Sequence, residues 1–88
     1  MSESPDSAEQ LVEELRRAKV SDLLAQTCSL VGSLAFGKLS ADARDLDQAR
    51  LGIEALKALA PLLDEAPRRD VQQLIANLQL AYAEAAKT

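Results

Sequence analysis

The chain has 88 residues, of which 27% are charged, and a formal net charge of −4. A chain of this length forms one small domain, whose core buries roughly 60–65% of the surface that the unfolded chain exposes. The sequence has no clustered basic face of the kind that nucleic-acid binders use to displace counterions, so we expect no nucleic-acid partner. Histidine, the commonest general base and metal ligand, does not occur. We therefore expect no enzyme, no metal and no other cofactor.

The composition is typical of helices. Leucine and alanine dominate, aromatic residues make up 2%, and there are three glycines and three prolines. Without β-branched or aromatic runs there is nothing to suggest strands, and we predict an all-α protein. The N-terminal ten residues lack the basic and apolar regions of a secretion signal. The uncharged run 23–37 is shorter than the ~20 residues that span a membrane. We expect a soluble, cytoplasmic protein without a membrane partner.

Residues 1–19 form an acidic N-terminal segment, partly disordered or a short amphipathic helix, before a helical domain at 20–88. We expect residues 1–5 to be disordered and a helix to follow over residues 7–19. Asp6 and Glu9 have the spacing of a capping box. The apolar positions of this helix are correctly spaced but few: Leu11, Val12, Leu15 and Ala18. The segment is expected to dock loosely, or to fold when a separate protein partner binds it.

The uncharged run 23–37 predicts the first helix of the domain. Ser21 is its expected N-cap, and Gly37 is expected to end it in the left-handed conformation. A helix without a charged face has no side to turn to water, so it must lie at the centre of a bundle or in a subunit interface. Small residues allow close approach of two helices on one side of it: Ala25, Ser29, Gly32 and Ser33. They fit packing within the chain, against the seam around Ile53, as well as a contact across a two-fold axis.

A long helix is predicted to follow an N-cap at Asp45, with Gln48 at the capping-box position. Its apolar residues alternate in steps of three and four, as in antiparallel bundles: Leu46, Ala49, Ile53, Leu56, Ala60 and Leu63. Pro61 lies on the opposite, polar stripe and is expected to bend the helix rather than end it. The alternative is that the helix ends at Ala60.

The last helix is predicted over residues 68–86, after a turn at 64–67 that contains Pro67. Its apolar stripe comprises Val71, Leu74, Ile75, Leu78, Ala81, Tyr82 and Ala85, and its other face carries Gln72, Gln73, Asn77 and Gln79 with Leu80 among them. From this helix we assign five residues to a predicted subunit interface, together with the small residues of the uncharged helix: Gln72, Asn77, Gln79, Leu80 and Tyr82.

Few residues suggest chemistry. Cys28 lies in the middle of a helix, without a nearby charge to activate it, and is best interpreted as a core residue. Arg68 and Arg69 begin the last helix, where ion pairs with neighbouring acids explain them more simply than a bound anion.

Three segments from Val20 onward resemble a small uncharacterised bacterial family, domain-of-unknown-function family eighteen-forty-four. They are SL…L..GKL at 29–39, DLDQARLGIEALKAL at 45–59 and LIANLQLAY at 74–82, and the resemblance extends over about three quarters of the chain. It implies a cytoplasmic helical domain of unknown function, without catalytic residues.

The sequence therefore predicts a three-helix domain, with a possible extra helix at the N-terminus and antiparallel long helices. We expect it to assemble as a dimeric helical bundle and to act as a protein–protein interaction or regulatory module. The alternative is a carrier that holds a small apolar ligand in its helical core.

Overall fold

The computed structural model describes the backbone of residues 5–87 and the side chains of residues 7–87. Within this range the protein is all-helical, as predicted, with four α-helices and no strand. The predicted capping side chain of Asp6 and the residues 1–4 of the predicted disordered segment lie outside the described part.

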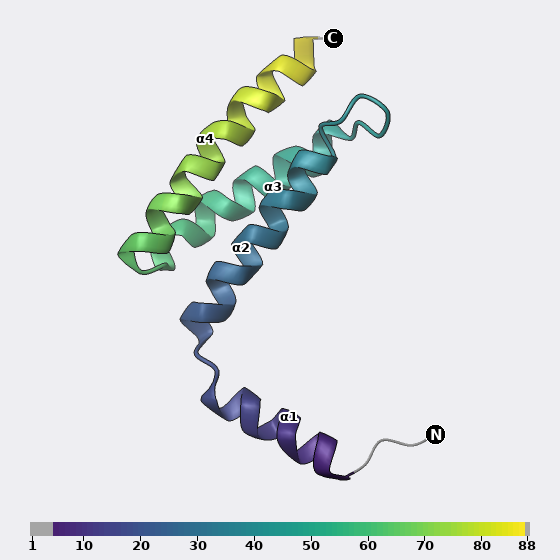
Figure 1. Ribbon diagram of the computed structural model, residues 1–88. Coiled ribbons are helices and arrows are strands. Elements are labelled where there is room, and N and C mark those ends of the chain that lie inside the picture. Colours follow the sequence, from purple (N-terminus) through teal and green to yellow (C-terminus); the bar gives the residue numbers. More distant parts are fainter. Residues whose placement is uncertain (1–4, 88) are drawn as a thin grey trace.

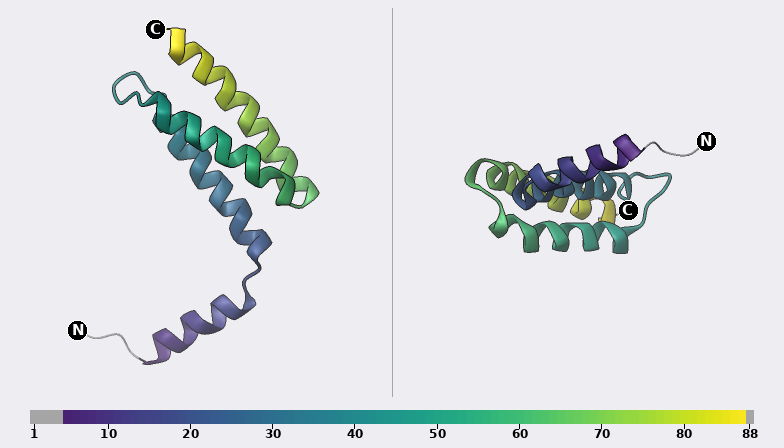
Figure 2. Two further views of the ribbon diagram at one scale, coloured as in Figure 1. Left: turned by 180° about the vertical axis from the view of Figure 1, so that it is seen from behind. Right: turned by 90° about the horizontal axis from the view of Figure 1, so that it is seen from below.

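Four helices follow one another along the chain: α1 (Pro5–Arg17), α2 (Val20–Gly37), α3 (Leu46–Leu59) and α4 (Glu65–Lys87), with a short 3-10 helix η1 (Ala60–Leu62) after α3. Helices α2, α3 and α4 pack against one another, whereas α1 contributes almost nothing to the contacts between elements. Figure 1 shows that the chain bends at residues 18–19, between α1 and α2, so that α1 points away from the other helices. In Figure 2, α3 covers one side of a layer that α2 and α4 form.

The core lies between α2, α3 and α4. Its most deeply buried large side chains are Cys28, Leu56 and Leu78, one from each helix, and each is 0% exposed. All residues of the apolar seam predicted around Ile53 are buried except Leu46, which is half-buried and packs against the same cluster. The α4 stripe is likewise buried at Val71, Leu78 and Ala85. The predicted core positions are therefore confirmed.

The N-terminus of α3 also forms as predicted. Asp45 is its N-cap, and the Oδ1 atom of this residue accepts a hydrogen bond from the backbone N–H of Gln48 at 3.2 Å. This contact satisfies one of the N–H groups that a helix leaves without partners in its first turn.

The ends of α2 differ from the prediction. Lys19, not Ser21, is the N-cap, and its side chain makes no capping hydrogen bond. Gly37 is the last helical residue, and no described glycine has a positive φ. A left-handed residue is not needed here, because the chain continues right-handed through Lys38, whose N–H donates to the carbonyls of Leu34 and Ala35. The Oγ atom of Ser40 in turn donates to the Gly37 carbonyl at 3.0 Å.

The prediction that Pro61 bends a continuing helix is wrong, and the alternative end near Ala60 is correct. Helix α3 ends at Leu59 and tightens into η1, in which Pro61 occupies the first turn. Leu63 follows with an extended backbone and is buried, so the change of direction still places it in the core. Helix α4 begins three residues earlier than predicted, at Glu65, with Pro67 inside its first turn, where proline costs no backbone hydrogen bond.

Candidate functional site

The most unusual surface of the protein is an exposed apolar face on α2 and α3. We define the α2–α3 apolar face by four leucines, Leu23, Leu30 and Leu34 on α2 and Leu51 on α3. Their side chains are between 59% and 72% exposed. On α2 the three leucines are seven and four residues apart, so they form one stripe along the helix.

Leu34 and Leu51 lie on the two sides of a groove with a volume of about 250 Å³ between α2 and α3. The groove is lined mostly by small or apolar side chains, namely those of Val31, Ala35 and Ala55 together with Gly52, with Lys38 and Gln48 at one end. Gly52 lets α2 and α3 approach closely here, because a Cβ atom at this position would lie 2.9 Å from the Cβ of Ala35. The close contact leaves the leucines outside the core rather than between the helices.

Helix α2 explains why this face is apolar. Only Cys28, Gly32 and Ala35 among its 18 residues are buried, and they all point towards α3 and α4. Asp22 is its one charged residue. By length and composition α2 also suits a membrane span, a test that the core helix of a soluble protein passes as well. The uncharged run thus has one side in the core and the other side open.

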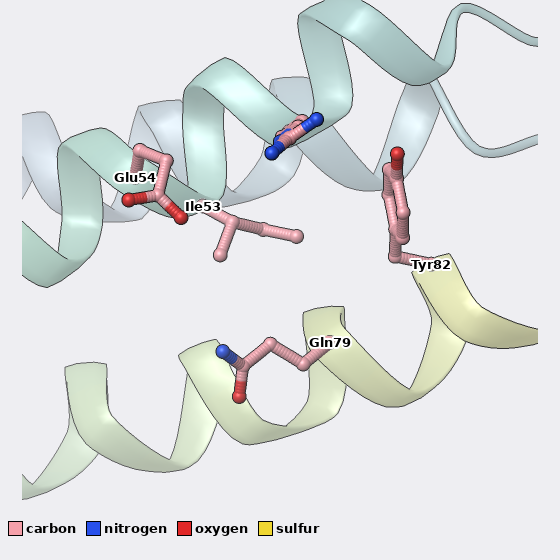
Figure 3. Close-up of a pocket in the computed structure, with 5 residues that line it drawn as sticks. Ile53, Glu54, Gln79 and Tyr82 are labelled. Carbon is pink, nitrogen blue, oxygen red and sulfur yellow. The ribbon is translucent and has the colours of Figure 1, made fainter.

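A second hollow, of about 390 Å³, lies between α3 and α4 and contains two of the residues predicted for the interface, Gln79 and Tyr82. Figure 3 shows Ile53 extending from α3 into the gap, with Tyr82 directed from α4 towards α3. Arg50 and Glu54 complete the lining. The hollow is open to solvent and offers a mixed polar rim, but it brings no nucleophile beside a base.

The other predicted interface residues lie on different sides of the molecule. Gly32 is buried, and a Cβ there would collide with the side chain of Leu74 on α4, so its small size serves packing within the chain. Ala25 is half-buried against the same core. Ser29 and Ser33 are exposed, and the Ser29 hydroxyl donates to the Ala25 carbonyl at 3.3 Å. The intrachain contact made by Gly32 is thus to α4, not to the seam around Ile53.

On α4 the predicted interface residues likewise do not share one face. Leu80 is 69% exposed and lies two residues before Tyr82, nearly on the opposite side of the helix. Asn77 is exposed and accepts a hydrogen bond from the side-chain amide of Gln73 at 3.1 Å. Gln72 lines a shallow hollow with Arg68 near the start of α4. Of the five predicted residues on α4, only Gln79 and Tyr82 line the same hollow.

The polar groups of the described residues provide little chemistry. Cys28 is buried as expected, and desolvation raises the pKa of its thiol above the ordinary value of 9.0. A raised pKa favours the neutral thiol, the unreactive form. No group of three or more acidic or cysteine side chains in the described part of the chain is arranged to hold a metal ion. Arg69 pairs with Glu65 at 3.1 Å, one of the ion pairs expected at the start of α4.

Sequence reasoning missed the four leucines of the α2–α3 apolar face, although the sequence contains a signal for the three that lie on α2. Val20, Leu23, Thr27, Leu30 and Leu34 follow one another in steps of three, four, three and four. This spacing is typical of a helix that packs against another helix. The small residues on another side of α2 are equally compatible with a helix contact, so the spacing of the leucines alone does not identify the exposed side.

Comparisons with protein-family models, with curated proteins and with solved structures found no match for this chain.

Proposed function

We propose that the protein is an interaction module that acts as a homodimeric helical bundle, with the α2–α3 apolar face covered by the second chain. The observation that carries this proposal is the stripe of Leu23, Leu30 and Leu34, which no other part of the described chain covers. Single exposed leucines are common on the surfaces of soluble proteins, whereas a patch of several exposed leucines is rare. Such a patch marks an interaction surface. The dimer would bring the long helices into an antiparallel bundle.

The lack of charge between Leu23 and Gly37 on α2 supports a second copy as the partner. Each chain carries a net charge of −4, so two copies repel each other over most of their surface. Between Leu23 and Gly37 there is no charged residue, and two copies can approach here without burying an unpaired charge. We retain the cytoplasmic location and the resemblance to domain-of-unknown-function family eighteen-forty-four as parts of this proposal.

The test is the solution mass, measured by light scattering on a sizing column over a hundredfold concentration range. We expect twice the monomer mass for the wild-type chain. Leu30→Glu places a carboxylate on the α2–α3 apolar face and should give a monomer. Ser29→Glu adds the same charge to the side of α2 that carries the small residues and should leave the dimer intact.

Two results would contradict the proposal in different ways. A wild-type chain that stays monomeric at every concentration would exclude the homodimer. A dimer that Ser29→Glu disrupts and Leu30→Glu does not would place the contact on the small-residue side. In either case circular dichroism of each variant must show that the helices are intact, so that loss of the dimer is not loss of the fold.

A further inference from the structure

Helix α1 presents an apolar stripe that none of the described residues covers. The stripe consists of Leu11, Val12 and Leu15, whose side chains are between 47% and 66% exposed. The opposite face of α1 carries charges, and Glu13 forms ion pairs with Arg16 and Arg17 at 3.6 and 3.8 Å. The helix is therefore strongly amphipathic, but every described side chain on it faces solvent.

A helix as short as α1 needs a packing partner. It has 13 residues, and isolated helices below about 12–15 residues are marginal in water even when they are rich in alanine. Most of the stability of such a helix comes from packing its apolar face against something else. In Figure 1 and in the left view of Figure 2, α1 points away from the other three helices. The described residues do not provide such a partner.

The total surface agrees with a missing partner. A compact folded protein of 9.4 kDa exposes about 5,000 Å², whereas this chain exposes 6565 Å². The additional accessible surface, roughly 1,500 Å², is larger than the surface of about 800 Å² that each partner buries in a standard interface. The radius of gyration is 16.8 Å, against about 12 Å for a compact chain of this length.

The two uncovered apolar surfaces match in length and character. Helix α1 is about 20 Å long, and the stripe from Leu23 to Leu34 extends about 17 Å along α2. Both are made of aliphatic side chains spaced for helix packing. A hollow at the bend between the two helices is lined by Leu15, Val20 and Leu23, with Lys19, Asp22 and Gln26 also on its wall. The apolar stripes of α1 and α2 therefore approach each other at the bend, beside these polar residues.

The hinge between α1 and α2 is short. Only residues 18 and 19 separate the two helices, and Lys19 has an extended backbone, with φ −103° and ψ 141°. A short hinge hinders α1 from folding back on the α2 of its own chain, and such hinges favour the exchange of an element between two copies. A second chain offers the same surface without this restriction.

The charges on α1 argue against lipid as the cover. Helices that lie on membrane surfaces carry mainly lysine and arginine on the polar face. Helix α1 instead carries more acids than bases: its acids are Asp6, Glu9, Glu13 and Glu14, and its bases are Arg16 and Arg17. This pattern suits a solvated outer face of a protein assembly.

We propose that two copies of the chain exchange α1, so that the apolar stripe of each α1 packs on the α2–α3 apolar face of the other chain. This inference rests on the proposed homodimer and assigns its contacts. Each dimer then contains two equivalent contacts between the chains, which we call junctions. In each junction, α1 of one chain packs against α2 and α3 of the other. A dimer in which the two α2 helices meet directly would leave α1 outside the contact.

The first test compares two variants of the full chain that add one negative charge to opposite faces of α1. Leu15→Glu should weaken self-association roughly a hundredfold, because it puts a carboxylate into an apolar junction. Gln10→Glu lies on the polar face and should leave the mass unchanged. A wild-type dimer that Leu15→Glu does not weaken would overturn the exchange while leaving the homodimer standing.

The second test mixes Leu15→Glu with Leu30→Glu. Each variant alone has two damaged junctions and should be monomeric. In a mixed dimer, the intact α1 of the Leu30→Glu chain meets the intact face of the Leu15→Glu chain, and one junction is restored. Mixing should therefore increase the dimer fraction measured by sedimentation at equal total concentration. Two monomeric variants that stay monomeric after mixing would overturn the exchange.

A third measurement addresses lipid. The wild-type chain is incubated with vesicles of phosphatidylcholine and phosphatidylglycerol, and bound protein is separated by flotation. We expect the protein to remain in the unbound fraction as a dimer. A monomeric chain that floats with the vesicles would overturn both the exchange and the homodimer, since lipid would then cover the apolar surfaces.

Discussion

Adding one methyl group at Gly52 or at Gly37 tests the packing of α2 against α3. Both glycines are helical with negative φ, so the backbone accepts alanine at either position. At Gly52 the new Cβ would lie 2.9 Å from the Cβ of Ala35 and 3.7 Å from a methyl group of Val31. At Gly37 the new Cβ would meet nothing within 4 Å. The same chemical change therefore has two different surroundings.

The expected effects have opposite signs. Replacing glycine by alanine in a helix contributes about 0.5–1 kcal/mol of stability. At Gly37 this gain is unopposed, and Gly37→Ala should stabilise the protein by about 0.5 kcal/mol. At Gly52 a carbon–carbon distance of 2.9 Å is well inside the ~3.5–4.0 Å optimum. Neither Cβ atom can rotate away, so α2 and α3 must separate, and such overpacking costs about 1–3 kcal/mol.

Gly52→Ala should therefore be destabilised by about 1 kcal/mol net, and the two variants should differ by about 1.5 kcal/mol. For a domain of this size that difference is about 6–12 °C in melting temperature. The assay is thermal unfolding followed by circular dichroism, at a fixed protein concentration for both variants and the parent. A Gly52→Ala protein as stable as Gly37→Ala would refute the close contact between α2 and α3.

Three further changes test the core and α1. Ile53→Asp puts an unpaired carboxylate into the buried seam and should lower the free energy of unfolding by several kcal/mol, which is comparable with a total stability of about 5 kcal/mol. The control Arg50→Ala, on the solvent side of the same helix, should change the free energy of unfolding by less than ~0.5 kcal/mol. Denaturant titrations measure both. Burial raises the pKa of the Cys28 thiol, so with rising pH the unfolded chain loses the thiol proton before the folded chain does. The free energy of unfolding should therefore fall as the pH rises above 9.0, and Cys28→Ala should remove this decline. Deleting residues 1–19 should leave the melting temperature of the remaining helices unchanged at concentrations where the full chain is monomeric, because α1 adds almost no contacts to them; a large decrease would show that α1 stabilises its own chain.

Periodicity predicted the core because burial is a property of a whole helix face. The seam through Ile53 and Leu56 and the stripe through Leu78 each repeat over several turns, so an error at one residue does not move the face. The Asp45–Gln48 contact was predictable for a similar reason, since the capping side chain and its backbone partner are three residues apart.

Helix ends were predicted less well because several local solutions compete. Pro61 is compatible with a bend or with the first turn of a new helical segment, and tertiary packing decides between them. Here the extended backbone of Leu63 directs its side chain into the core after the 3-10 turn, which a continuous helix would not achieve in the same way. Gly37 can end a helix in the left-handed conformation, but the hydrogen bond from Ser40 and the right-handed Lys38 satisfy the carbonyls without it.

The sequence predicted that the uncharged helix lies at a bundle centre or in an interface, but it did not predict which side of the helix remains exposed. The lack of charge from Leu23 to Gly37 indicated a bundle centre or an interface. Which side of the helix faces its own chain depends on α3 and α4, and Gly32 and Ala35 contact these helices because their small size permits close approach. The side with Cys28, Gly32 and Ala35 is therefore in the core, whereas Ser29, Ser33 and the side with the leucines remain exposed. From the spacing of the residues alone, either side of α2 could pack against another helix.

The two alternatives for the uncharged helix are therefore compatible with each other. The core explains the side of α2 that carries Cys28, Gly32 and Ala35, and it leaves a stripe of leucines that the described chain does not cover. A monomer would expose this stripe and the stripe on α1 together, at a cost of about 25 cal/mol for each Å² of apolar surface that a partner removes from water. Covering about 200 Å² of apolar surface is worth about 5 kcal/mol before the entropy cost of association, which is comparable with the total stability of a chain of this size. On this argument self-association and folding are coupled, so the midpoint of thermal unfolding should rise with protein concentration.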